Sequence, residues 1–182
     1  LGRPVVSNEE IQQLVSLDPE RFIGFASVDP YREDAHAVLE HAFNALGLAG
    51  VKLHPSRQKI FPNDPLLFPI YELCLQYNKP ILFHAGMSLQ PDTPSQYAHP
   101  AGFEEIAIRY PRLRFCLAHF GWPWVVETAA LLLKYPNIYT DTGLLYFDSA
   151  REFYNDVFKK QLGEHWVDRS LRHQVMFGSN NP

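Results

Sequence analysis

Six short and nearly continuous apolar runs divide the chain, and each has the length and composition of a buried β-strand. These runs start 24 to 37 residues apart, which is the length of one strand plus one crossover helix. Continuous apolarity is typical of strands that are covered on both faces. The pattern therefore predicts a parallel sheet of repeating βα units, with strands over 21–27, 50–54, 80–84, 113–119, 137–141 and 174–179.

The segments between these runs have the period and the end signals of helices. Apolar residues of 33–46 form one stripe, and Gly47 follows where a left-handed C-cap is expected. A capping box at 7–10 predicts a first helix that extends to about Leu17. Asp64 and Pro65 predict the start of another helix, which ends near Asn78. Further helices are expected over 102–110, 122–135 and 149–162.

Strands that alternate with helices at this spacing are compatible with a closed eightfold barrel or an open doubly wound sheet. An open sheet that binds a nucleotide usually carries a glycine-rich turn after its first strand. Here that strand is followed by Val28, Asp29 and Pro30, without a glycine. The pattern leaves both architectures open but does not support a nucleotide site.

Composition and charge limit the classes of partner that the chain is expected to bind. With 182 residues, of which 46% are hydrophobic, the chain is expected to form one domain over 1–182. The formal net charge of −4, without a basic run, argues against nucleic acid as a partner. No apolar run approaches the roughly 18 residues that span a bilayer, and the N-terminus lacks signal-peptide features, so we expect no membrane partner and a cytoplasmic location. Cys74 and Cys116 are expected to be buried free thiols.

Polar side chains stand at the end of every predicted strand. Because the carboxyl ends of parallel strands in a barrel share one rim, these side chains are expected to meet around one cavity. Strand alternation places Lys52 and His54 on one face, and it places His119 on the same face as Leu117. The set comprises Asp29, Lys52, His54, His84, His119, Asp141 and Asn180.

Imidazoles on neighbouring strands can bind Zn²⁺ or a similar ion, which lowers the pKa of its bound water to about 7. A further imidazole that is not a ligand can orient the substrate or carry a proton, and His119 suits that role. Simpler structural explanations compete with these roles. A histidine before a proline, such as His54, often closes a strand, and Lys52 needs either an ionic partner or a function. Asp141 suits either a partner of a histidine or a turn residue.

Several strings resemble the strand motifs of the amidohydrolase-related family, in the family's order and over nearly the whole chain. The family consists of metal-dependent TIM-barrel enzymes that include aminocarboxymuconate semialdehyde decarboxylase, resorcylate-type decarboxylases and lactone or amide hydrolases. The resemblance implies a TIM (β/α)8 barrel of which this chain contains about six of eight strands. The strings are RFIGFASVDP at 21–30, GVKLHP at 50–55, ILFHAG at 81–86, LAHFGWPW at 117–124, NIYTDTG at 137–143 and MFGSNNP at 176–182.

The same resemblance implies one divalent metal ion, Zn²⁺ or Mn²⁺, at the carboxyl rim. His84 matches the metal ligand of the fifth barrel strand, and His119 matches a histidine that contacts the substrate. Lys52 and His54 match a strand whose residues line the substrate pocket in some members, and Trp122 is expected to line it as well. Two features depart from the family pattern.

The first departure is that the H-x-H or E-x-H pair of the family's first strand does not occur here. The second is at Asn180, which stands where the family usually has the aspartate of F-G-S-D-Y-P. We assign Asn180 to this metal-binding and catalytic position, although an amide is a poorer metal ligand than a carboxylate. An incomplete barrel exposes strand edges, so a homo-oligomer is a possible assembly.

These features favour a metal-dependent hydrolase that acts on an amide, ester or lactone bond of a small carboxylated molecule. The first alternative is a non-oxidative decarboxylase of the same family, in which His119 or the residue at 180 moves the proton. The second is a non-catalytic binding module on the barrel scaffold. Release of CO₂ and metal content distinguish the three.

Overall fold

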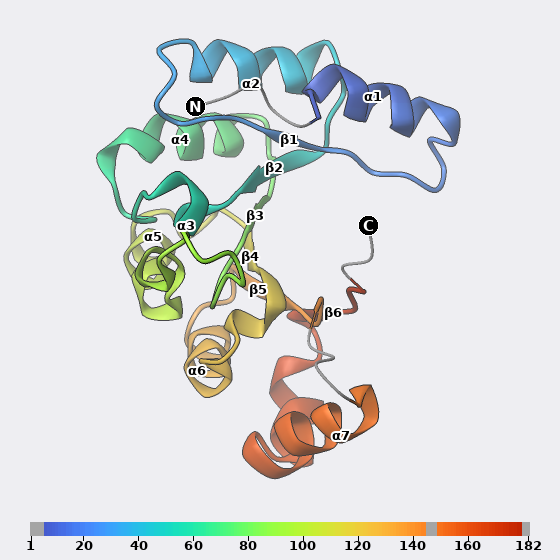
Figure 1. Ribbon diagram of the computed structural model, residues 1–182, viewed down its shortest axis with the longest axis vertical. Helices are drawn as coiled ribbons and strands as arrows, with labels where there is room; N and C mark the ends of the chain where they lie inside the picture. The colour runs from blue at the N-terminus through green and yellow to red at the C-terminus, as the bar shows by residue number, and fades with distance from the viewer. Residues whose placement is uncertain (1–5, 145–148, 180–182) are drawn as a thin grey trace.

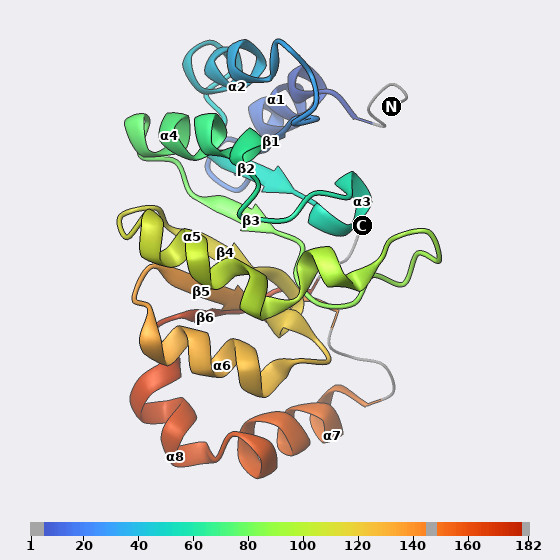
Figure 2. The ribbon, with the colours of Figure 1, turned by 90° about the vertical axis from the view of Figure 1, so that its left-hand side faces the viewer.

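The computed structural model describes residues 6–144 and 149–179 and shows one sheet of six parallel strands. The strands follow one another in space in the order in which they occur along the chain (Figure 2). They are β1 (Phe25–Ser27), β2 (Gly50–Leu53), β3 (Ile81–Phe83), β4 (Phe115–Leu117), β5 (Ile138–Asp141) and β6 (Val175–Met176).

Helices connect the strands and pack on one side of the sheet, as Figure 1 shows for α2, α4, α5 and α6. A doubly wound sheet reverses its strand order and has helices on both faces, whereas sequential parallel strands with helices outside are the arrangement of a barrel. The fold is therefore a six-stranded part of a TIM barrel. Its main helices are α1 (Asn8–Leu17), α2 (Ala35–Asn44), α4 (Phe68–Gln76), α5 (Glu104–Arg109), α6 (Val125–Lys134) and α7 (Ala150–Tyr154).

The predicted helices are present, but several differ at their ends. Short 3-10 turns over Pro65–Leu67 and Pro100–Phe103 precede α4 and α5. The helix predicted over 149–162 consists of α7 and a π-helical segment, Asn155–Gln161. The helical segments that were not predicted include α3 (Pro55–Gln58), a single turn that is too short to show a hydrophobic period. They also include α8 (Glu164–Trp166), which continues into a π-helical segment over Val167–Leu171. Every helix of the described ranges is too short or too polar to cross a membrane.

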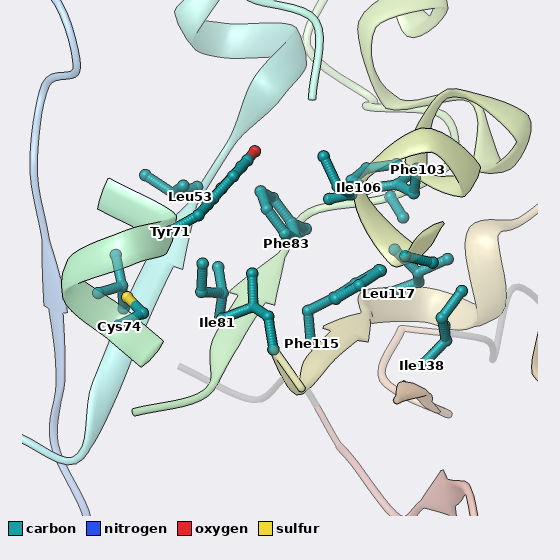
Figure 3. Packing of buried hydrophobic residues seen from close by; sticks show 14 of the residues in the cluster. Leu53, Tyr71, Cys74, Ile81, Phe83, Phe103, Ile106, Phe115, Leu117 and Ile138 are labelled. Atoms are coloured by element: carbon teal, nitrogen blue, oxygen red, sulfur yellow. The ribbon is translucent and has the colours of Figure 1, made fainter. Parts of the chain in front are cut away.

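Alternate residues of each strand point to opposite faces of the sheet, and the outer face forms the core. Figure 3 shows Ile81 and Phe83 of β3 pointing toward Tyr71 and Cys74 of α4. The Phe83 ring lies 5.1 Å from the Phe103 ring and is fully buried. Cys74 and Cys116 are buried free thiols, as predicted.

The inner face carries the other half of each strand and is only partly covered. In the strand register, Lys52 lies beside Leu82, Leu82 beside Cys116 and Cys116 beside Tyr139. Lys52, Leu82 and Tyr139 are all partly exposed, unlike the residues that alternate with them along the strands. This face would be the interior of a closed barrel, and here it forms the floor of the candidate site.

Candidate active site at the carboxyl rim of the sheet

Three histidines meet where β2, β3 and β4 end. The ring of His54 stacks on that of His84, with the centroids 3.9 Å apart and the planes 9° from parallel. The ring of His119 meets His84 edge-on at 5.0 Å. The predicted convergence of histidines at one rim is therefore present in the fold. It results from the parallel register, which brings the ends of adjacent strands to the same level.

His84 is the most buried of the three and has an unused nitrogen. Its side chain is 8% exposed, and Nε2 has no hydrogen-bond partner within the described residues. Burial, with smaller contributions from His54 and His119, lowers the pKa of His84 to about 2. The imidazole is neutral at working pH, which is the form that binds a metal ion.

His54 has a structural role as well as a place in the cluster. Its Nδ1 accepts a hydrogen bond from the Arg57 backbone N–H at 3.2 Å and caps α3. Its backbone N–H donates to Gln58 Oε1 at 3.0 Å. Burial and the nearby charge of Lys52 lower the pKa of His54 to about 4. The histidine therefore closes its strand and also presents a neutral ring to His84.

The prediction that His119 shares the face of Leu117 is wrong. β4 ends at Leu117, whose side chain is buried on the outer face. The backbone then enters the left-handed region at His119 (φ 60°) and Phe120 (φ 49°). This turn breaks the strand alternation, and it places His119 in the lining of the inner cavity.

Asp141, at the end of β5, holds this turn. Its Oδ1 accepts hydrogen bonds from the backbone N–H of His119 and of Gly143, both at 2.9 Å. The Cys116 thiol donates to Oδ2 at 3.7 Å. The His119 ring is fixed separately, because its Nδ1 lies 2.8 Å from the Gly143 carbonyl oxygen. Asp141 is therefore the turn residue, and its contact with His119 is through the backbone N–H rather than the imidazole ring.

Lys52 lies on the inner face, two residues before His54 and thus one side-chain layer below the histidines. Burial lowers the pKa of the Lys52 ammonium, and the negative charge of Asp141 opposes this shift. Among the described residues the ammonium has no ion pair, so the first of the two alternatives for this lysine is not met there.

A cavity of about 540 Å³ covers this floor. Its charged and polar side chains are Lys52, Arg114, His119 and Asp141, and its apolar lining includes Phe25, Leu82, Cys116, Tyr139 and Met176. A largely apolar cavity with a few converging polar groups is the usual form of a site for a small molecule. Asp141 belongs to the predicted set of strand-end side chains. Cys116 and Tyr139 were not among the predicted site residues, although their alternation with core residues marks them as inward-facing.

Trp122 lies near the rim, where it packs against the hydrophobic core. Its carbonyl oxygen accepts a hydrogen bond from the Met87 backbone N–H at 2.7 Å. A Cβ at Gly86 (φ +86°) would collide with this carbonyl, so the close approach requires glycine. The segment after β3 is thereby fastened beside the turn that carries His119.

His84 is chemically suited to bind a divalent metal ion, because it offers a neutral imidazole whose Nε2 has no hydrogen-bond partner among the described residues. It does not complete a site, since no three potential ligands come together in the part of the chain that the structure describes. Asn180 lies outside the described residues.

Fold and rim together define a partial TIM barrel with a histidine cluster above an inner cavity. The chain belongs to the amidohydrolase family, whose model matches residues 4–182. It is 30% identical over 130 residues to 2-amino-3-carboxymuconate-6-semialdehyde decarboxylase from Dictyostelium discoideum, a match that covers 63% of this chain and 36% of the relative.

Solved structures share the fold. An uncharacterised TIM-barrel protein from Bordetella bronchiseptica superposes with a TM-score of 0.77 at 22% identity, over 96% of this chain and 59% of that protein. The 5-carboxyvanillate decarboxylase of Novosphingobium aromaticivorans, solved with manganese and a nitrobenzoic acid derivative, gives 0.67 at 15% identity, over 96% and 58%. The chain thus spans about a third of the curated relative and under two thirds of these structures.

Proposed function

We propose that this chain forms the catalytic rim of a metal-dependent, non-oxidative decarboxylase that acts on a small carboxylated molecule. The observation that carries the proposal is the histidine cluster at the rim of a largely apolar cavity whose floor holds Lys52, an ammonium without an ion pair among the described residues. Relatives named as decarboxylases support this chemistry over the hydrolysis that the sequence motifs favour. We also propose that residues 1–182 form a single domain.

His84 would hold the metal ion, because its buried Nε2 has no other partner in the described chain. A bound Mn²⁺ or Zn²⁺ supplies a Lewis acid that neutralises and orients the oxygens of the substrate. Manganese in the Novosphingobium decarboxylase supports the first of these ions. Asn180 remains the expected residue at the acidic position.

Lys52 would bind the carboxylate of the substrate at the floor, where a desolvated ammonium gains most from an anionic partner. The apolar lining would then hold the rest of the molecule. His54 and Trp122 are not among the lining residues of the cavity, and their contact with the substrate on the rim side is part of the proposal. Loss of CO₂ breaks the bond between the carboxyl carbon and its neighbour. The electron pair stays on the neighbouring carbon, which takes a proton from protonated His119, and the imidazole returns to its neutral form.

The experiment is a CO₂-release assay on the purified protein with Mn²⁺ or Zn²⁺ and a panel of aromatic and muconate carboxylates. We expect CO₂, a fall of about 10²-fold or more in kcat for His119→Gln, and a rise in KM for Lys52→Met. Arg57→Met, which removes an exposed cation near the same rim, is the matched control and should leave both constants unchanged. Acid release without CO₂ would overturn the proposal in favour of hydrolysis, and ligand binding without metal or turnover would favour a binding module.

A further inference from the structure

We propose that Asp141 is a positioning residue that turns His119 into the cavity and fixes which of its nitrogens faces the substrate. In this arrangement Nδ1 keeps its proton and Nε2 is the nitrogen that exchanges one. Only the catalytic use of Nε2 rests on the proposed function, since the arrangement itself is a property of the folded chain.

The backbone turn that carries His119 needs contacts that stabilise it. His119 and Phe120 are consecutive non-glycine residues at positive φ, a strained conformation that residues with a Cβ rarely adopt. Such a turn persists only where surrounding contacts stabilise it. The Phe120 side chain is fully buried, and the His119 N–H donates to a carboxylate, which is a stronger acceptor than a neutral group.

The imidazole ring of His119 is held by a hydrogen bond that fixes its tautomer. A carbonyl oxygen only accepts hydrogen bonds, so the contact of 2.8 Å between His119 Nδ1 and Gly143 O requires the proton on Nδ1. In a neutral imidazole Nε2 then carries a lone pair. The ring lines the cavity and faces His84, so this lone pair belongs to the candidate site.

One carboxylate oxygen stabilises both the turn at His119 and the residue that holds the His119 ring. Asp141 Oδ1 accepts from the backbone of His119 and from the backbone of Gly143, the residue that holds the ring. Removal of this oxygen therefore releases the turn and the tautomer together. A residue that served only to end β5 would bind Gly143 but would not contact the strand next to it.

The test reads the tautomer directly, by long-range ¹H–¹⁵N correlation spectra of protein labelled with ¹⁵N-histidine, above about pH 8, where imidazole is neutral. The signals of His119 are identified by their absence in His119→Gln. We expect a protonated Nδ1 in the unmodified protein and loss of this preference in Asp141→Ala. Asp141→Asn retains an acceptor oxygen and is expected to keep the Nδ1 tautomer.

Asp29→Ala is the matched control, because the side chain of this aspartate after β1 accepts a hydrogen bond from the local backbone N–H of Tyr31 and bonds no neighbouring strand within the described residues. It should leave the His119 signals unchanged. A protonated Nε2 in the unmodified protein, or an unchanged tautomer in Asp141→Ala, would overturn the inference. In the CO₂ assay we expect Asp141→Ala to lower kcat about 10²-fold with little change in KM, and Asp141→Asn to recover most of it. A fixed Nδ1 tautomer without CO₂ release would overturn the proposed function alone.

Discussion

Burial of His84 as a neutral imidazole should make the folded chain sensitive to acid. Its pKa is about 2 in the folded protein, against about 6.5 for an unperturbed histidine. Between these two values the unfolded chain binds a proton that the folded chain does not. Stability is therefore complete above about pH 6.5 and falls as the pH drops toward the folded-state pKa.

The magnitude follows from the unfolded-state titration. Between pH 7 and pH 5, protonation of one unfolded histidine lowers the free energy of unfolding by about 2 kcal/mol. This value holds for any folded-state pKa well below 5, so it does not depend on the depth of the shift. It is a large part of the roughly 5–15 kcal/mol that stabilises a domain. His54, with a pKa lowered to about 4, acts in the same direction.

The measurement is urea unfolding at pH 7 and pH 5 with a chelator present, so that no metal ion competes for the histidines. With a slope of about 2 kcal/mol per molar urea, the His84 contribution corresponds to a midpoint shift of about 1 M. His84→Gln removes this contribution, and the difference between the two pH values should shrink accordingly. His36→Gln, at an exposed position of α2, is the control. Equal pH dependence in His84→Gln and the unmodified chain would refute the reasoning.

Three further changes test the fold. Phe83→Ala, at a fully buried ring that packs on Phe103 and Phe115, should lower the free energy of unfolding by about 3–5 kcal/mol in the same urea titration. Ser7→Ala removes the capping box of α1 and should cost about 1 kcal/mol, with loss of protection of this helix in hydrogen exchange. Gly121→Ala places a Cβ against the Thr128 hydroxyl at φ +60°, so we expect it to lower the melting temperature. Gly47→Ala is the control, because Gly47 is also at positive φ but faces open space, and the melting temperature of this variant should fall less.

The sequence predicted the six strands and their direction because continuous apolar runs and crossover lengths are local features. The hydrogen-bonded strands are shorter than the runs, with β1 limited to Phe25–Ser27 within the predicted 21–27. Ladder pairing requires a neighbour at the same level, which composition does not show. The choice between barrel and open sheet also depended on tertiary structure, since it rests on the order of the strands.

The site could be predicted as a gathering of strand ends but not in its detail. His54 and His84 directly follow their strands, so their positions at the strand ends sufficed to predict that they meet at the rim. His119 lies within a left-handed turn that Asp141 of another strand holds, and no period in the sequence reveals such a contact. The roles of Lys52, Trp122 and Asn180 stay predictions, and Asn180 lies outside the described residues.

The strand order has a consequence for how the chain acquires its structure. Each strand pairs with the one synthesised just before it, so every βα unit finds its neighbour already present as the polypeptide leaves the ribosome. Contacts between units that are close in sequence form with a small loss of chain entropy. Assembly can thus proceed in the direction of translation, with each unit added to the last, and the histidine cluster is complete only when the fifth strand brings Asp141 against the turn that carries His119.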